Sequence, residues 1–278
     1  MRTIFLLLLT LLSVVSIQAQ TFLGSYGNRN ARLAEIMPLD KSILECVYSY
    51  KIYDTELDES REFYKILEIG NKFSKFSNYG SYRVDSIVKT DYPKGLTVNE
   101  YGRLVKSNRP TTESLIKDIK LGSIRSYDKV YMDYYVFEEP TPNIQWKLES
   151  ETKTICGYNC HQATAVFRGR KWTAWYCDLP INNGPWKFGN LPGLILKIKD
   201  ENNEHVFEAI IIRKSNNEFG LKKLNYQKTS REKFNKALSD YKSNPALFIS
   251  GSPNTPKDNN GNEFIPNNRL FFNPIEKE

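Results

Sequence analysis

The fold of this chain is decided by residues 184–196, which read Gly-Pro-Trp-Lys-Phe-Gly-Asn-Leu-Pro-Gly-Leu-Ile-Leu. Turn-forming residues and two large aromatic side chains are followed by a purely aliphatic run. Pro192 fixes φ at about −65° and Gly193 tolerates a positive φ, so the pair predicts a type II turn over residues 191–194. The aliphatic residues after the turn predict a buried strand over residues 194–198.

Alternating hydrophobic residues extend this β-type pattern along the chain. The clearest case is residues 46–53, where Cys46, Tyr48, Tyr50 and Ile52 share one face. The chain contains 17 Tyr and 13% aromatic residues, a composition typical of half-buried sheet faces. Nine segments in all predict a mainly β fold, an antiparallel meander sheet or a curved half-barrel: 46–53, 63–69, 72–77, 130–137, 144–148, 160–167, 171–177, 194–198 and 206–212.

Helical patterns are few, and we expect one or two short helices. Thr229 followed by Glu232 is a capping-box pattern, and the apolar spacing after it predicts a helix over residues 229–243. Residues 110–122 predict a second helix, which begins at Pro110 and ends at Gly122.

The first 19 residues predict a Sec signal peptide. Arg2 precedes an almost wholly apolar run over residues 4–17, and Ala19 supplies the small residue at the cleavage point. The run is shorter than the ~18 to 20 residues of a membrane-spanning helix, although an uncleaved anchor is the alternative. We expect cleavage near Ala19 and a periplasmic or secreted protein with no membrane span after cleavage.

The remaining sequence predicts one β-rich domain over residues 42–249. Residues 20–41 form a lead-in of uncertain structure, and residues 250–278 read as a loop-rich C-terminal tail that is rich in Pro, Gly and Asn.

The charge distribution argues against a nucleic-acid partner. The formal net charge is +7, and signal cleavage removes only Arg2 among the charged residues. Basic residues are scattered, with no block longer than Lys222-Lys223, whereas nucleic-acid binders cluster them on one element. A solvated basic exterior is the favoured interpretation, and a mild attraction to anionic surfaces or glycans is the alternative.

Four cysteines in an exported chain predict disulfides, with three pairings open. We favour Cys46 with Cys160 and Cys156 with Cys177. The alternative is a metal or redox site at Cys156, Cys160 and His161. Because Cys160 and His161 point to opposite faces of a strand, both cannot easily bind one ion, so we predict no metal and no cofactor.

No catalytic constellation is visible in the sequence. There are two histidines, no Gly-x-Ser-x-Gly elbow, no phosphate-binding glycine loop and no His-Glu-x-x-His helix. Carboxylates distant in the sequence can still meet in a fold, so a hydrolase remains an alternative.

Aromatic residues gather at one place and are candidates for ligand or partner contact: Trp172, Trp175, Trp186 and Phe188. The simpler interpretation is that they form the core. Trp172 and Trp175 are three residues apart, so they should face opposite sides of one strand.

The block from Trp146 to Ile198 resembles the GLPGLI family of exported proteins of Bacteroidetes. The resemblance is carried by Ile155-Cys156-Gly157-Tyr158-Asn159-Cys160, Gly184-Pro185-Trp186-Lys187-Phe188 and Leu191-Pro192-Gly193-Leu194-Ile195, and by Asn273-Pro274-Ile275-Glu276 at the end. Asn190 stands where the motif has its first Gly, and Asn tolerates a positive φ better than other non-Gly residues. We therefore expect Asn190 to serve the turn through its backbone.

The resemblance implies no activity and no catalytic residues, because the family is named for its motif. Three hypotheses follow from the sequence. The first is an exported, envelope-associated binding or accessory protein without catalysis, whose partner is an envelope protein or a hydrophobic ligand. The second is a carrier of lipid or acyl chains, similar in fold to lipoprotein carriers. The third is a hydrolase that uses distant carboxylates.

Overall fold

The computed structural model describes residues 27–250 and 268–277, which divide into two compact units. The smaller unit contains residues 27–34 and 80–110, and the larger unit contains residues 35–79 and the residues from 111 onward. The predicted signal peptide lies outside the described residues. Each unit is described separately below.

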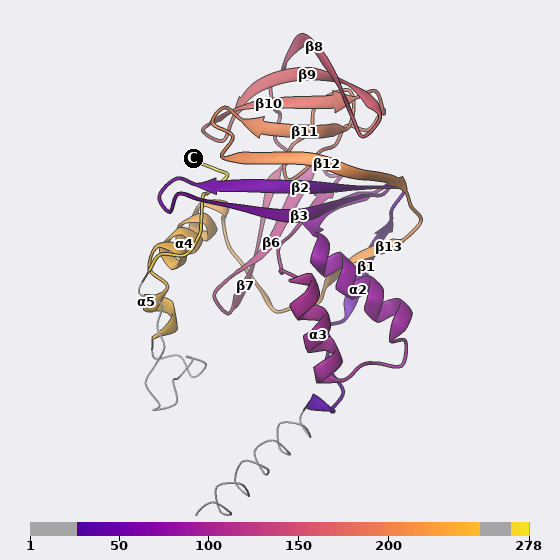
Figure 1. Ribbon diagram of the computed structural model, residues 1–278, viewed down its shortest axis with the longest axis vertical. Helices are drawn as coiled ribbons and strands as arrows, with labels where there is room; N and C mark the ends of the chain where they lie inside the picture. Colours follow the sequence, from indigo (N-terminus) through magenta and orange to yellow (C-terminus); the bar gives the residue numbers. More distant parts are fainter. Residues whose placement is uncertain (1–26, 251–267, 278) are drawn as a thin grey trace, which may run out of the picture. The chain divides into compact units, whose positions relative to one another are not determined.

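The larger unit contains a sheet of twelve strands, eleven of which form two meanders. The first meander runs through β2 (Leu44–Asp54), β3 (Glu59–Ile69), β4 (Phe73–Asn78), β5 (Ser114–Asp118), β6 (Ser123–Val130) and β7 (Asp133–Pro140). The second runs through β8 (Lys147–Ile155), β9 (Tyr158–Phe167), β10 (Arg170–Cys177), β11 (Ile195–Asp200) and β12 (His205–Lys214). Antiparallel pairing of β2 with β12 joins the two meanders, so β8 to β12, β2 and β3 lie in succession (Figure 1).

Three short strands complete the β structure of the described residues. β14 (Tyr226–Lys228) pairs with β7 in parallel, while β1 (Ile36–Lys41) and β13 (Glu218–Lys222) form a separate antiparallel pair. The predicted mainly β fold is therefore confirmed, as an open sheet in which antiparallel pairing dominates.

Two hairpins owe their tight turns to consecutive residues with positive φ. Cys156 and Gly157, with φ of 49° and 80°, connect β8 to β9, while Arg168 and Gly169, with φ of 50° and 70°, connect β9 to β10. Two central residues with positive φ define a type I′ turn, whose twist matches that of the flanking strands.

The predicted helix at residues 229–243 is confirmed as α4 (Arg231–Ser243), and a short helix α5 (Ala246–Ile249) follows it. The N-cap is Ser230, one residue after the predicted Thr229, and its side chain accepts from the Lys233 amide. Phe234 of α4 packs with Val130 and Phe137, so the helix covers part of β6 and β7.

The predicted helix at residues 110–122 is wrong, because residues 114–118 form β5 between β4 and β6. A short apolar run is compatible with both the helical and the strand pattern. Here the consecutive residues Leu115 and Ile116 are both buried, as in a strand that is covered on both faces.

The smaller unit holds two helices that the sequence analysis missed, α2 (Tyr79–Asp91) and α3 (Val98–Asn108). A reciprocal capping box between Thr97 and Glu100 begins α3, and this sequence pattern could have predicted the helix.

The turn before β11 differs from the predicted type II geometry. Asn190 has a φ of 65°, in agreement with its expected backbone role, whereas Gly193 has no positive φ. Gly193 is required for a different reason: a Cβ there would overlap the carbonyl oxygen of Cys177. Because the two segments approach so closely, the Cys177 amide donates a hydrogen bond to the Leu194 carbonyl over 2.9 Å. This hydrogen bond aligns the end of β10 with the start of β11.

We predict that Gly193→Ala lowers the free energy of unfolding by about 3 kcal/mol, because the added methyl group forces β10 and residue 193 apart. Gly189→Ala is the matched control, since a Cβ at Gly189 would lie 3.4 Å from Asn182 Oδ1, an ordinary contact distance. Urea denaturation of both variants measures the difference. Equal losses would contradict the assignment of Gly193 to a close approach.

All four cysteines are free in the structure, so neither predicted disulfide is present. The register places Cys160 opposite Cys177, not opposite Cys46, and Cys46 lies on β2, three strands away from β10. Cys156 sits in the hairpin turn, where its thiol donates to the Ala209 carbonyl over 3.1 Å. The two disulfides were predicted from the spacing of the cysteines in the sequence. The order of the strands in the sheet keeps the predicted partners apart.

We expect one fast-reacting thiol in the folded protein. Cys156 is exposed, whereas Cys46, Cys160 and Cys177 are buried, and burial raises the pKa of each buried thiol. Labelling with a thiol-reactive chromophore should consume one equivalent rapidly and three more after unfolding, and Cys156→Ser should abolish the fast phase. Fewer than four thiols in the unfolded, unreduced protein would show that a bridge exists.

Candidate functional site

A cavity of about 430 Å3 lies in the larger unit, against one face of the first meander and β12. Eight aromatic side chains line it: Tyr50, Phe76, Tyr127, Phe137, Trp186, Phe207, Phe234 and Phe272. Leu115, Leu238 and Ile275 add aliphatic surface. A concave, mainly apolar space of a few hundred Å3 is typical of small-molecule sites.

Strand register explains why these side chains meet. Phe76 is paired with Leu115, Leu115 with Ser126, and Ser126 with Phe137, so one row crosses β4, β5, β6 and β7. Residues directly opposite one another on neighbouring strands point to the same face of the sheet. The row therefore forms a continuous floor that is apolar except at Ser126.

Trp186 enters the cavity from the loop before β11. The Phe188 amide donates to the Pro185 carbonyl over 3.1 Å, which closes a turn with Trp186 at its second position. Trp186 has a φ of 50°, a left-handed conformation that bulky residues rarely adopt. Such strain persists only where the surroundings impose it, and it concentrates at functional sites.

Lys117 of β5 holds this loop in place. Its ammonium group donates to Asn183 Oδ1 at 2.8 Å, to the Gly184 carbonyl at 3.1 Å and to the Phe188 carbonyl at 2.7 Å. The three acceptors use all three N–H groups of the side chain. Burial lowers the pKa of Lys117 to about 7, because removal from water disfavours the charged form.

The C-terminal residues 272–277 cover the cavity and are called the strap below. They contribute Phe272, Pro274, Ile275, Glu276 and Lys277 to the lining. The Phe272 amide donates to Asp54 Oδ2 over 2.8 Å, and the Asn273 side chain donates to the Tyr53 carbonyl over 2.7 Å. The predicted C-terminal tail thus has its last described residues bound to the sheet.

Arg170 holds the strap in place through hydrogen bonds. This side chain is buried, and its five N–H groups have five acceptors within 3.1 Å: Asp200 Oδ2, Glu204 Oε2, Asn273 Oδ1 and the carbonyls of Pro274 and Ile275. Burial opposes ionisation of Glu204, but the hydrogen bonds from Arg170 and Asn273 and the charges of Arg170 and Lys277 together outweigh it and hold the pKa of Glu204 at about 2. Glu204 is therefore ionised at neutral pH.

A second ionic cluster binds Glu276 of the strap. Lys187 is buried and pairs with both Glu139 and Glu276, and Arg231 donates to Glu276 over 3.1 Å. Burial disfavours the Glu276 carboxylate, yet these cations keep its pKa below its usual range. The ammonium of Lys187 also lies 5.2 Å from the Trp186 ring centroid, which connects the loop to the strap.

Polar groups gather at another edge of the cavity, on β3, β5 and β6. Lys65 forms an ion pair with Glu113, and burial lowers the pKa of Lys65 to about 8. Asp128 of β6 also lines the cavity. Burial raises the pKa of Asp128, although Lys65 and Lys242 nearby oppose this effect.

The other predicted contact residues lie elsewhere. Phe188 is fully buried, with its ring centroid 4.7 Å from that of Trp172 in the core. Trp172 is 1% exposed and Trp175 is 8% exposed, with the Lys153 ammonium 4.0 Å from the Trp175 ring centroid. Of the four aromatic candidates, Trp186 alone lines the aromatic cavity.

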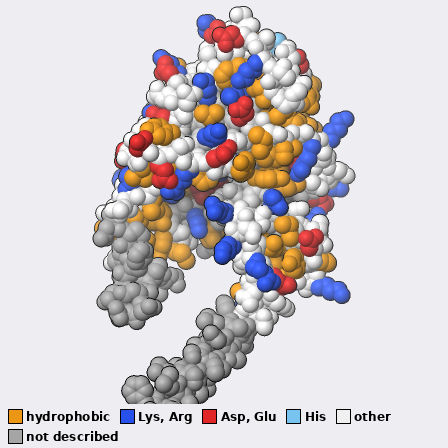
Figure 2. All heavy atoms as spheres, viewed as in Figure 1, with side chains coloured by type: hydrophobic (Ala, Val, Ile, Leu, Met, Phe, Trp, Pro, Cys, Tyr) orange, Lys and Arg blue, Asp and Glu red, His pale blue; other side chains and the backbone are white. Residues whose placement is uncertain are grey.

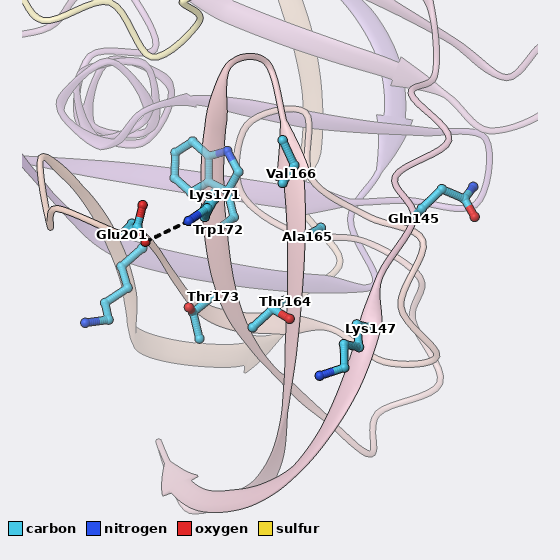
Figure 3. Close-up of a pocket in the computed structure, with 10 residues that line it drawn as sticks. Gln145, Lys147, Thr164, Ala165, Val166, Lys171, Trp172, Thr173 and Glu201 are labelled. Atoms are coloured by element: carbon cyan, nitrogen blue, oxygen red, sulfur yellow. Dashed lines mark hydrogen bonds and ion pairs between the residues drawn. The ribbon is translucent and has the colours of Figure 1, made fainter.

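A second hollow lies over β9, β10 and neighbouring segments, and Figure 3 shows its lining. The side chains are mainly polar, among them Lys147, Thr164 and Thr173, and Lys171 pairs with Glu201 over 3.1 Å. Trp172 lies at its base but offers almost no exposed surface. The hollow lacks an exposed ring that could stack against a ligand, so the aromatic cavity is the stronger candidate.

Three further observations concern surface charge, membrane-spanning helices and metal ligands. On the face shown in Figure 2, Lys and Arg side chains are interspersed with Asp and Glu over the larger unit. Within residues 27–250 and 268–277, no helix has the length and apolar character needed to cross a membrane. In the same residues, no group of three or more Cys, His, Asp or Glu side chains is placed to hold a metal ion.

A comparison with protein families matches residues 119–239 to the N-terminal domain of N-glycanase peptides. The matched segment covers β6 to α4, including Ser126, Trp186 and the first two turns of α4. It is less than half of the chain. No curated protein matches the sequence.

Two solved structures, both of PNGF-II, are similar to this chain at 16% sequence identity. One is in the P21 space group, with a TM-score of 0.48, and the other is in the C2 space group, with a TM-score of 0.46. In each case the similarity covers 73% of this chain and 34% of the other. The chain therefore spans about a third of the length of the structures it matches.

Lys117 should make stability depend on pH. Its pKa is about 7 in the folded protein and near the ordinary 10.5 after unfolding, so the unfolded state binds more protons between these values. The free energy of unfolding should rise by about 2 kcal/mol between pH 7 and pH 9, relative to a Lys117→Met variant measured in parallel. Below pH 7 the difference between the two proteins should be constant. A difference that falls as the pH rises would contradict a buried ammonium at this position.

Proposed function

We propose that this protein is an exported binding protein, which holds the apolar part of a small ligand in the cavity beneath the strap. The observation that supports this proposal most directly is the aromatic cavity of about 430 Å3 with Trp186 in its wall. The volume lies in the usual range for ligand pockets, about 300 to 1,000 Å3. The proposal keeps the binding role expected from the sequence and adopts its hydrophobic-ligand alternative.

The construction of the site supports a binding role. The strained backbone of Trp186, the three hydrogen bonds of Lys117 and the two ionic clusters under the strap all fix groups before any ligand arrives. A preformed site loses little conformational entropy on binding. The predicted export by a signal peptide and the proposed membership of the GLPGLI family place this activity in the cell envelope.

A second candidate is glycan binding or cleavage, which the match to the N-glycanase N-terminal domain favours. Glu113 and Asp128 both line the cavity, and both lie near the Lys65 ammonium, so they are the carboxylates that such a reaction would use. Release of N-glycans from a glycopeptide by purified protein, lost in Glu113→Gln or Asp128→Asn, would favour this candidate over simple binding.

The binding proposal predicts that Trp186→Ala lowers the affinity of the protein for an apolar ligand. N-phenyl-1-naphthylamine is an uncharged fluorescent probe, and its titration should show saturable binding to the wild-type protein. Loss of the indole should raise the Kd about tenfold, because one aromatic contact in a desolvated pocket contributes about 1.4 kcal/mol.

Tyr64→Ala is the matched control, because Tyr64 is an exposed aromatic residue of β3 that does not line the cavity. Its Kd should equal that of the wild type. Binding that is absent in the wild type, or equally tight in Trp186→Ala, would contradict the proposal. Circular dichroism of each variant confirms that the fold is kept.

A further inference from the structure

Ser126 is the one side chain of the apolar floor that carries a polar group. It stands between Leu115 on β5 and Phe137 on β7, in the row that begins at Phe76. Its Oγ is buried and has no hydrogen-bond partner among the described residues. A buried hydroxyl without a partner costs about 1 to 3 kcal/mol, so its presence in the floor requires an explanation.

The charged groups of the lining, in contrast, already have partners. Among the described residues that line the cavity, Lys65 pairs with Glu113, and Lys187 pairs with Glu276. Lys277 lies 3.6 Å from Glu204, outside the lining, and Asp128 lies within the field of Lys65 and Lys242.

This charge balance argues against an ionic ligand. A carboxylate or ammonium entering the cavity would have to separate an existing pair. Removing one partner of a buried pair leaves an uncompensated charge, which costs several kcal/mol. A neutral polar group meets no such penalty, and Ser126 offers it a hydroxyl that can both donate and accept.

We propose that the cavity takes an uncharged ligand with an apolar ring body and one hydroxyl or amide group, and that this group pairs with Ser126 Oγ. The inference rests on the proposed binding function and narrows its ligand class. It disfavours fatty-acid carboxylates, which an acyl-chain carrier would otherwise accept. Ser126 lines the cavity while its Oγ is itself buried, so the proposed pairing requires the hydroxyl to turn toward the ligand.

Three ligands of the same ring size test this inference: naphthalene, 2-naphthol and 2-naphthoate. Each is titrated as a competitor of N-phenyl-1-naphthylamine at pH 7, where 2-naphthol is neutral and 2-naphthoate is charged. The wild-type protein should bind 2-naphthol about fivefold more tightly than naphthalene, the ratio that one net hydrogen bond gives. It should bind 2-naphthoate less tightly than 2-naphthol.

Ser126→Ala should reduce the preference for 2-naphthol over naphthalene to about one, while naphthalene itself binds as well as before. The matched control is Ser114→Ala, which removes a hydroxyl from a residue of the same cavity on the neighbouring strand and should keep the fivefold preference. Ser126→Ala should not lower the midpoint of thermal unfolding, because it removes an unpaired polar group. A structural role for the hydroxyl would lower that midpoint.

Two results would overturn the inference while leaving the binding function intact: an unchanged preference in Ser126→Ala, or tighter binding of 2-naphthoate than of 2-naphthol. The same holds if N-phenyl-1-naphthylamine binds and none of the three ligands displaces it. If N-phenyl-1-naphthylamine fails to bind the wild-type protein, or binds Trp186→Ala equally well, the binding function fails and this inference falls with it.

Discussion

The buried guanidinium of Arg170 is the constraint on which the candidate site depends. It joins three parts of the larger unit: β10, where it originates, the end of β11 and the connection to β12, which supply Asp200 and Glu204, and the strap. All five of its N–H groups are used, so the desolvated charge is fully compensated. Because the strap has no regular secondary structure, these hydrogen bonds and those of Glu276 are what give the cavity a fixed roof.

Much of the fold could be predicted from the sequence, because the signals involved are local. The alternation over residues 46–53, the glycine hairpin at residue 169 and the capped helix near residue 231 each depend on neighbours in the chain. Errors arose where long-range contacts decided the outcome. Residues 114–118 became a strand because β4 and β6 flank them, and Gly193 serves a close approach to Cys177 that no local pattern reveals.

The candidate site was predictable in part for the same reason. Trp186 attracted attention through its position among turn-forming residues, and it does line the cavity. Phe188 looked equivalent in the sequence but points into the core, since the two residues occupy different positions of one turn. Lys117, Arg170 and Ser126 gave no signal, because a lysine, an arginine and a serine in strands look like solvent-facing residues until the partner strands are known.

The lining of this cavity limits what it can select. Its ionic groups compensate one another, so they stabilise the loop and the strap without being available to a ligand. In the proposed site, discrimination between apolar ligands of similar shape comes from the buried hydroxyl of Ser126, which has no hydrogen-bond partner among the described residues. A site with an unpaired buried group rejects a ligand that cannot satisfy it more strongly than a purely apolar pocket rejects one of the wrong size. A single serine in an apolar row can thus set specificity, because its buried hydroxyl has no hydrogen-bond partner among the described residues.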